Sequence, residues 1–304
     1  MSGRGVSRRD LLRMGGIAGL ALPAAGLLAA CGSSPSTSST TASSAGDPLL
    51  AKVRKAGVIN IGLANDPPAS IINPNGTVSG LGPVVVEKIM KKLGVPKVKG
   101  EVATFGELIP GLQAGRWDMI GGVISVTKAR CAVVLYSDPF QYNGLEIAYF
   151  PDAVSPAPKT IADVVSRGLT AGFNSGSAYI AYCQSKGMSA SKVVQFPDTP
   201  SLLAALQEKR IQVVVSDTGS LTLTAQQVKQ YPFHHVDYPK DGPFICGALA
   251  FRPSDKVFAE AFGKEFTALK QSGEFAKISK EFDSPPFPKN LAPLTAKQAC
   301  SRVS

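Results

Sequence analysis

Three polar side chains with complementary chemistry stand close together in the stretch GGVISVTKARCAVV, residues 121–134. Ser125 and Thr127 are two residues apart, and Arg130 follows three residues later in a largely apolar neighbourhood. The planar guanidinium of arginine can hold a carboxylate through two parallel charge-assisted hydrogen bonds, which lysine cannot do. With the hydroxyls and backbone groups beside it, the segment predicts a site for a small zwitterion. A surface arginine that caps a helix is the alternative interpretation.

Two further segments could bind the other parts of such a molecule. In GFNSGSAY, Gly176 permits a close backbone approach, and the Ser177 hydroxyl with the amides of Ser177 and Ala178 can donate to an anion. Asp217 follows the apolar run IQVVVS, where its carboxylate can receive an ammonium group. For both segments the alternative is helix capping, in the case of Asp217 for a helix beginning at Thr218.

The elements around these segments alternate between strand and helix, which is typical of a parallel sheet covered by helices. The first set has predicted strands over 58–63, 98–103 and 118–124 and helices over 83–93 and 105–114. The second set has strands over 169–173, 193–196 and 213–216 and helices over 177–185, 200–209 and 220–231. Two extended runs, 145–150 and 245–251, are well placed to cross between the sets.

This order predicts an α/β protein with two doubly wound lobes joined by two hinge strands. The stripe Phe258, Phe262, Phe266 and Leu269, which ends before Gly273, returns the chain to the first lobe. We expect lobe 1 to comprise 47–146 and 248–304 and lobe 2 to comprise 147–247. Ligands of open α/β sheets bind beyond the carboxyl ends of strands, so the segments around Arg130 and Ser177 should face one cleft.

The first 31 residues have the features of a targeting segment. The twin-arginine sequence SRRDLL is followed by an apolar run, 15–30, that is too short and too rich in Gly, Ala and Pro for a stable membrane span. The run ends in LAAC, which resembles the bacterial lipobox, so we expect cleavage before Cys31 and lipidation of that cysteine. An ordinary signal peptide with a chance cysteine is the alternative. Residues 32–46 predict a flexible tether that reaches about 20 Å.

The body from Asp47 onward has 258 residues, enough for two lobes. Residues 1–31 carry four Arg and one Asp, so the rest of the chain has 28 basic and 21 acidic side chains and a net charge of +7. The lysines are scattered and no basic helix with interleaved aromatics occurs, which favours a solvated or lipid-facing surface over a nucleic-acid partner. No other run reaches the roughly eighteen apolar residues of a membrane span, so we expect a soluble body.

Four cysteines follow Cys31, namely Cys131, Cys183, Cys246 and Cys300. An even number in an oxidising compartment favours one or two disulfides, and three full pairings are open. No CxxC spacing occurs, and the adjacent His234 and His235 would face opposite sides of a strand. We therefore expect neither a metal site nor a Cys–His nucleophile.

The order of GLANDPPASI, FGELIPGLQAGRWDMIGGVISVTKAR, SDPF, GFNSGS and VVVSD resembles the family 3 extracellular solute-binding proteins of ABC importers. The resemblance covers about residues 52–282 and is most specific over 105–140. Several shorter segments are similar to the ectoine and hydroxyectoine branch of this family, namely KKLGV, ELIPGLQAGRWDM, KARC, KQSGEF and LTAKQAC. The family resemblance implies a type II periplasmic-binding-protein fold, hinge closure over a small zwitterion and delivery to a membrane permease. No cofactor is implied, and we expect a monomer.

The resemblance also implies roles for individual residues. In lobe 1, Arg130 matches the carboxylate-binding arginine, Ser125 a ligand-contacting serine and Phe105 an aromatic wall, while Thr127 matches a backbone amide donor. In lobe 2, the matching residues are Ser177, for its hydroxyl, and Asp217, for the α-ammonium group.

The chain departs from the family pattern in several respects, and two of the departures concern aromatic rings. An aromatic usual near Asp66 is absent from Asp66-Pro67-Pro68-Ala69, and Ser125 stands where the ectoine branch has a ring. Loss of rings removes a stacking surface for a weakly hydrated cation. Asp66 could instead select a cationic amino acid, or it could only start the turn before Pro67. The sequence leaves the ligand open between amino acids and ectoine-like solutes.

Two other function classes compete with solute capture for import. An enzyme on this scaffold, such as a dehydratase of cyclohexadienyl acids, would need a positioned acid or base. Asp217 and Glu107 are the only candidates, so we expect no enzyme. A ligand-sensing lipoprotein that signals to a partner fits the same sequence, because fold does not fix function.

Overall fold

The computed structural model describes residues 47–73, 75–217, 220–221, 233–237, 242–243, 245–284 and 294–302. The predicted signal segment 1–31 with Cys31, the tether 32–46 and most of the predicted helix 220–231 lie outside these residues. None of the helices within the described ranges is both long and apolar enough to span a membrane.

The first sheet has six strands in the order β4-β1-β5-β13-β6, with β7 also paired to β13. Their bounds are β1 Val58–Leu63, β4 Lys97–Val102, β5 Met119–Ser125, β6 Leu135–Tyr136, β7 Gln141–Asn143 and β13 Ile245–Phe251. β1 runs parallel to β4 and β5, whereas β13 is antiparallel to its three partners. The sheet is therefore mixed, and only its β4-β1-β5 part has the predicted parallel pairing.

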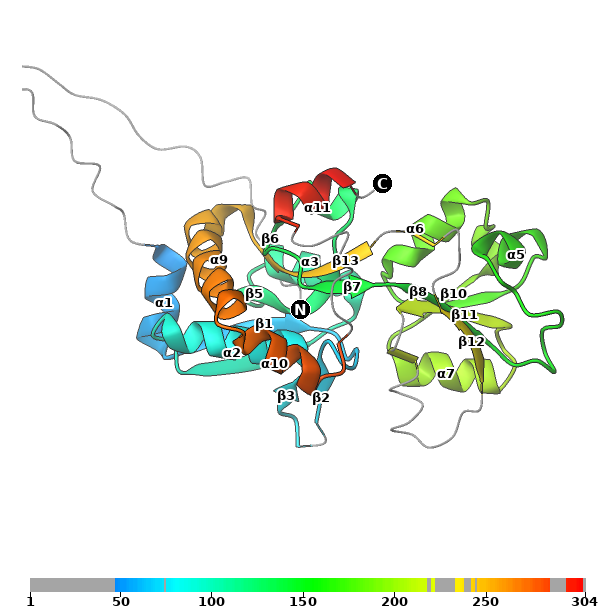
Figure 1. The fold of residues 1–304 in the computed structure, drawn as a ribbon, viewed down its shortest axis with the longest axis horizontal. Helices are drawn as coiled ribbons and strands as arrows, with labels where there is room; N and C mark the ends of the chain where they lie inside the picture. Colours follow the sequence, from blue (N-terminus) through cyan, green and yellow to red (C-terminus); the bar gives the residue numbers. More distant parts are fainter. Residues whose placement is uncertain are drawn as a thin grey trace, which may run out of the picture. The chain divides into compact units, whose positions relative to one another are not determined.

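Helices cover both faces of this sheet (Figure 1). They are α1 Pro48–Ala56, α2 Leu81–Lys92, α3 Phe105–Gln113, α4 Lys128–Cys131, α9 Lys256–Gln271, α10 Glu274–Glu281 and α11 Ala296–Arg302. The predicted Phe258–Phe262–Phe266 stripe of α9 is fully buried against α2 and the sheet. The other face packs on Trp117, whose indole N–H donates to Leu108 O over 3.1 Å. Two separate cores thus fix the strand ends of this sheet.

The second sheet has five strands in the order β10-β9-β11-β8-β12. The elements of this part are β8 Leu145–Tyr149, α5 Ile161–Ser166, β9 Ala171–Asn174, α6 Ala178–Ser185, β10 Val193–Phe196, α7 Thr199–Gln207, β11 Val213–Asp217 and β12 His234–Asp237. β9 is parallel to β10 and β11, and β8 is antiparallel to β11 and β12. Apolar cores again lie on both faces, one with α5 and α6 and one with α7.

The predicted elements that fall in the described ranges are confirmed within two residues at each end. α2 begins at Leu81 rather than at Pro83, because first-turn N–H groups lack partners in a helix anyway and proline is tolerated there. Its N-cap Gly80 has φ of 104°, and a Cβ there would meet Ser70 Cα at 2.8 Å. The sequence did not predict the two-stranded β2–β3 hairpin, Ile71–Ile72 with Val78–Ser79, or the short turns of 3-10 helix at Ala190–Lys192 and Pro253–Asp255. It also gave no prediction for several described elements, namely helices α1, α4, α5 and α11 and strands β6, β7 and β12.

The extended runs 145–150 and 245–251 were expected to cross between the two sheets, but neither of them does. β8 pairs only within the second sheet and β13 only within the first, so each run belongs to one sheet. The chain changes sheet at Gly144, between β7 and β8, and again before β13. These changes lie within three residues of the predicted lobe boundaries, which remain a prediction.

Cys131 and Cys300 form a disulfide, whereas Cys183 and Cys246 are buried thiols. The bond joins α4 to α11 across 169 residues of sequence. This is one of the pairings that the sequence left open, and it satisfies the expected minimum of one disulfide.

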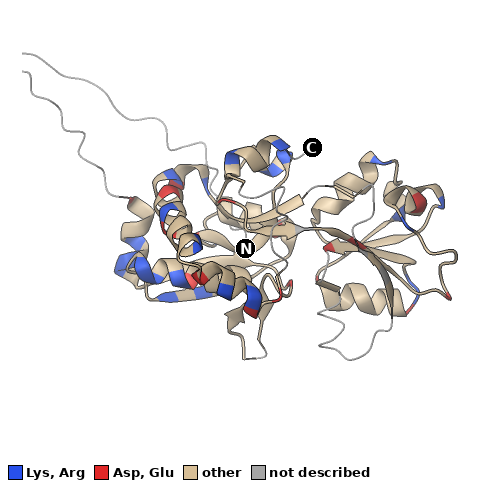
Figure 2. Ribbon diagram, in the orientation of Figure 1, with Lys and Arg blue, Asp and Glu red and all other residues tan. Residues whose placement is uncertain are grey.

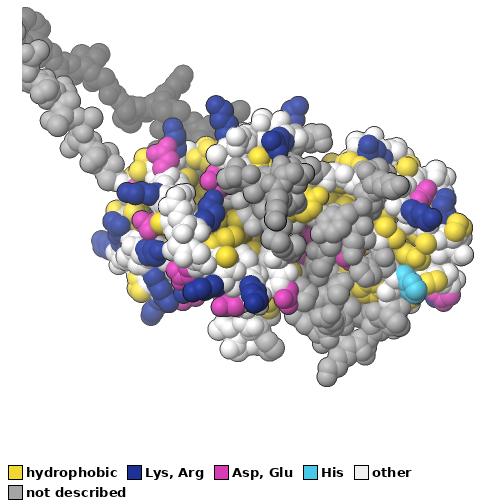
Figure 3. Space-filling view, in the orientation of Figure 1, with side chains coloured by type: hydrophobic (Ala, Val, Ile, Leu, Met, Phe, Trp, Pro, Cys, Tyr) yellow, Lys and Arg dark blue, Asp and Glu magenta, His cyan; other side chains and the backbone are white. Residues whose placement is uncertain are grey.

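Lys and Arg residues are prominent on α1, α2, α9 and α10, and acidic residues stand among them on α2, α9 and α10 (Figure 2). The space-filling view shows charged side chains of both signs on this face (Figure 3). Several form surface ion pairs, such as Lys88 with Glu274 at 2.8 Å and Lys91 with Glu87 at 2.6 Å. Exposed pairs of this kind contribute little to stability. The mixed signs agree with the expected solvated surface.

Candidate functional site

The carboxyl ends of β1 and β5 in the first sheet and of β9 and β11 in the second carry the predicted site residues. Asp66 follows β1, Arg130 follows β5, and Asp217 is the last residue of β11. Such strand ends are where open α/β sheets bind ligands.

Arg130 connects segments that belong to the two sheets. Its Nη1 donates to Ser125 O over 2.9 Å, and its Nη2 donates to Gly176 O, in the turn before α6, over 2.8 Å. Burial lowers the pKa of Arg130, while Tyr136 and Asp217 act in the opposite direction. Arginine nevertheless stays protonated in proteins. The half-buried guanidinium is therefore a fixed positive charge between the two sheets, and the interpretation as a surface helix cap is wrong.

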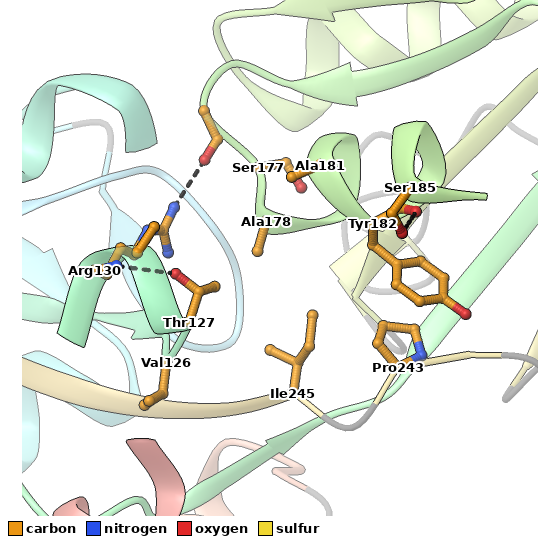
Figure 4. Close-up of a pocket in the computed structure, with 12 residues that line it drawn as sticks. Val126, Thr127, Arg130, Ser177, Ala178, Ala181, Tyr182, Ser185, Pro243 and Ile245 are labelled. Atoms are coloured by element: carbon orange, nitrogen blue, oxygen red, sulfur yellow. Dashed lines mark hydrogen bonds between the residues drawn. The ribbon is translucent and has the colours of Figure 1, made fainter. Parts of the chain in front are cut away.

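A cavity of about 390 Å³ opens beside this guanidinium (Figure 4). Four of the predicted residues line it, namely Thr127, Arg130, Ser177 and Ala178. The rest of its wall includes Ala181, Tyr182 and Ile245. Ser125, Phe105, Asp217 and Asp66 are not among its lining residues. The cavity thus has a cation, hydroxyls and a helix N-terminus at one end, which suits an anionic group.

Ser177 is the N-cap of α6, where its Oγ accepts from Tyr179 N over 3.3 Å. Thr127 has the same role in α4, because its Oγ1 accepts from Arg130 N over 3.3 Å. The capping alternative for Ser177 is therefore realised in this structure. Capping leaves Ser177 and Thr127 in the cavity wall, so the two roles are compatible.

Gly176 makes a close backbone contact, but its partner is the backbone of Gly106 rather than a ligand. Its φ is 77°, and a Cβ there would lie 2.5 Å from Gly106 Cα. Gly106 N also donates to Ser175 O over 3.2 Å. The first turn of α3 therefore packs directly on the turn before α6.

We expect G176A to lower the free energy of unfolding by about 1–2 kcal/mol for the left-handed backbone alone, and by more through the clash with Gly106. G187A is the matched control, because Gly187 also has a positive φ, 96°, but a Cβ there would make only an ordinary 3.6 Å contact with Val165 Cγ1. Urea denaturation of both variants measures the difference. Equal losses would mean that the Gly106–Gly176 contact contributes nothing.

Asp217 accepts a 2.8 Å hydrogen bond from Tyr179 Oη, which also lies 3.2 Å from Gly144 O. Burial first, and Asp217 second, raise the pKa of Tyr179 well above its usual value, so the phenol stays a donor. Asp217 also raises the pKa of Arg130. Arg130 and Asp217 therefore share one electrostatic environment. Thr218, which Asp217 was alternatively expected to cap, lies outside the described residues.

Asp66 is buried, and its Oδ1 accepts from Ser220 Oγ over 2.7 Å across 154 residues of sequence. Its pKa is raised from 3.8 to about 7, first by burial and second by Asp217, while the Ser220 hydrogen bond acts in the opposite direction. The Asp66 backbone exchanges two hydrogen bonds with Ser70. The carboxylates of Asp66 and Asp217 thus lie close enough to repel each other. Ionisation of both at once is favourable only when a cation lies beside them.

Phe105 begins α3 and is half-buried against the Trp117 core. Glu107, two residues later, is exposed and accepts from Thr104 N and Oγ1, both over 2.9 Å. These two bonds lower the pKa of Glu107. Glu107 is therefore a helix-capping carboxylate, and it is no longer a candidate acid of the cleft.

Sequence reasoning missed Tyr179, Ser220 and Gly106. Tyr179 could have been found, because a tyrosine at an apolar position of a helix needs a partner for its hydroxyl. Ser220 and Gly106 carry no comparable signal, since their contacts join residues far apart in sequence. Within the described ranges no group of three or more His, Cys, Asp or Glu side chains is arranged to hold a metal ion.

Comparison with known proteins finds relatives among bacterial solute-binding proteins. Residues 59–284 match the model of bacterial extracellular solute-binding proteins, family 3. A probable amino-acid ABC transporter periplasmic-binding protein, y4tE of Sinorhizobium fredii, is 25% identical over 272 residues, 84% of this chain and 87% of that protein. The ABC transporter arginine-binding protein 1 of Escherichia coli is 25% identical over 229 residues, 74% of this chain and 90% of that protein.

Among solved structures, EhuB in complex with hydroxyectoine superposes with a TM-score of 0.77 at 30% identity, covering 83% of this chain and 97% of that one. The likeness confirms the predicted two-lobed, type II periplasmic-binding-protein fold. Since the family model spans most of the chain and both sheets that carry the candidate site, this protein belongs to the bacterial extracellular solute-binding proteins of family 3.

Proposed function

We propose that this protein is the extracytoplasmic receptor of an ABC importer and captures a zwitterionic amino acid that carries an additional positive charge. The carboxylate of the solute binds Arg130, with Thr127, Ser177 and Ala178 completing the anion site. Its α-ammonium group binds Asp217. Lobe 1, 47–146 and 248–304, and lobe 2, 147–247, close over the solute, and a membrane permease receives it. Lipidation of Cys31 anchors the receptor outside the membrane.

One observation carries this proposal. Arg130, which follows a strand of the first sheet, donates to Gly176 O just before α6 over 2.8 Å, and Asp217, at the end of a strand of the second sheet, accepts from Tyr179 Oη in α6 over 2.8 Å. A dipolar solute placed between them would satisfy both charges and would touch both lobes. Contacts with both lobes are the differential interaction that closure requires.

The second carboxylate, Asp66, favours a cationic side chain over an ectoine-like ring. Its buried position beside Asp217 raises its pKa to about 7, so it is poorly satisfied as an anion without a cation. The two relatives suggest different solutes, since one is named as an arginine-binding protein and the other is in complex with hydroxyectoine. Ser125 stands where an aromatic ring would favour the second.

L-arginine and L-citrulline separate these ligand classes, because they have nearly the same shape and differ in the charge at the side-chain end. We expect L-arginine, L-lysine or L-ornithine to raise the melting temperature, and L-citrulline and hydroxyectoine to do so much less. Asp66→Asn should weaken L-arginine binding at least about tenfold and leave any citrulline binding unchanged. Tight hydroxyectoine binding that is insensitive to Asp66→Asn would overturn the cationic assignment.

A second candidate function is favoured by the same pair of carboxylates. A general acid works best with a pKa near the operating pH, and Asp66 meets that condition. A dehydratase of cyclohexadienyl acids would consume prephenate or arogenate at neutral pH. Turnover of either compound, lost in Asp66→Asn, would support the enzyme, whereas amino-acid binding without turnover supports the receptor.

A further inference from the structure

The helix that carries Arg130, α4, has little intrinsic stability. α4 has only four residues, Lys128–Cys131, and none of them is fully buried. Its cap is the single 3.3 Å hydrogen bond from Arg130 N to Thr127 Oγ1. Isolated helices shorter than about twelve residues are marginal in water, so this one needs support from tertiary contacts.

That support comes from the helix near the other end of the chain. Cys131, the residue after Arg130, is bonded to Cys300 in α11. Ala299 beside it is fully buried in the core that contains Trp117. The α11 N-terminus is fixed as well, since Ala296 N donates to Asp138 Oδ1 over 3.0 Å. The other oxygen of Asp138 lies 3.5 Å from Lys270 Nζ, in α9.

We propose that the Cys131–Cys300 disulfide positions Arg130 for solute binding by fixing α4 to the docked helix α11. The inference rests on the proposed role of Arg130 in holding a carboxylate. The guanidinium must keep its fork within reach of both the solute and the Ser125 and Gly176 carbonyls. Binding groups work only when held to about 0.5 Å, and the residue that bears this one is covalently adjacent to the cross-link.

A positioning role differs from general stabilisation in what it predicts for affinity. If the cross-link only stabilises the fold, its removal lowers the melting temperature but leaves the affinity of the folded molecules unchanged. If the cross-link positions Arg130, its removal also lowers the affinity at temperatures where the protein is fully folded, and this loss occurs only while Arg130 is present. The two effects can therefore be separated on one set of variants.

The test uses the full chain with Cys131→Ser/Cys300→Ser, and Cys131→Ala/Cys300→Ala as a second pair should the serines prevent folding. Leu269→Ala is the matched control, because Leu269 is fully buried in the other core and its truncation destabilises the fold without touching α4. Calorimetry measures Kd for L-arginine and for hydroxyectoine at 15 °C, with and without Arg130→Ala. Hydrogen exchange measures the protection of amides 126–134 without any ligand.

We expect removal of the cross-link to weaken binding of the better probe about tenfold and to accelerate exchange at 126–134, while Leu269→Ala does neither. In the Arg130→Ala background, removal of the cross-link should cause no further loss of affinity. Unchanged Kd, or unchanged exchange at 126–134, overturns the proposal. If neither probe binds the unsubstituted protein, the proposed ligand class fails, and the exchange measurement alone decides whether the disulfide holds α4.

Discussion

Replacing Arg130 with alanine should weaken binding of the solute at least about 100-fold. The guanidinium lines the cavity and is the fixed cation of the proposed anion site, and truncating one partner of a desolvated charge pair costs about 2–5 kcal/mol. The same change removes the 2.8 Å bond to Gly176 O, which links segments of the two sheets. Calorimetric titration with L-arginine, and with hydroxyectoine in parallel, measures the loss.

Arg116→Ala is the matched control for Arg130→Ala. Arg116 is an exposed arginine stacked 5.0 Å from the centre of the Trp117 ring, and it does not line the cavity. Its removal should leave Kd unchanged within about twofold. Arg130→Lys tests geometry separately from charge, because lysine keeps the charge but not the two-pronged donor. Full affinity in Arg130→Lys would show that a point charge suffices, and full affinity in Arg130→Ala would remove Arg130 from the site.

Replacing Asp66 with asparagine should stabilise the protein at alkaline pH while impairing binding of a cationic solute. The pKa of Asp66 is raised from 3.8 to about 7 in the folded state, so folding favours its protonated form. The stabilisation from this proton is complete below about pH 3.8 and is lost as pH rises through about 7. At pH 8 the buried carboxylate then costs the folded state on the order of 2–4 kcal/mol, which asparagine avoids.

Denaturant titrations between pH 4 and pH 9 check this expectation. The free energy of unfolding of the unsubstituted protein should fall between about pH 4 and pH 7 relative to Asp66→Asn, and the gap should stay constant above pH 8. Asp152→Asn is the control, because Asp152 is an exposed carboxylate paired with Lys209 and its removal should change stability little. Parallel pH profiles for Asp66→Asn and the unsubstituted protein would mean that Asp66 ionises normally.

The opposite effects on stability and binding have one physical source. Two nearby carboxylates, Asp66 and Asp217, are unfavourable for the empty fold and favourable for a cation placed beside them. A loop aspartate that merely starts the turn before Pro67 would show neither effect. The pair of measurements on Asp66→Asn therefore separates the two interpretations that the sequence left open.

Local sequence patterns predicted most elements of the fold and the segments that carry the candidate site. Apolar runs with β-branched residues predicted strands such as 193–196 and 213–216, because burial and side-chain periodicity are local properties. The spacing of Ser125, Thr127 and Arg130 pointed to an anion site, since all three follow one strand. Position after a strand end is likewise a local signal, and it selected Ser177 and Asp217.

Pairing across sequence was decided only by the tertiary structure. No local signal says that Cys131 pairs with Cys300, that Ser220 donates to Asp66, or that Gly106 packs on Gly176, because each contact joins residues that are far apart in the sequence. The raised pKa of Asp66 is of the same kind, since it depends on burial and on a neighbour about 150 residues away. The sequence determines which groups reach the strand ends, and the packing of two sheets determines which of them meet.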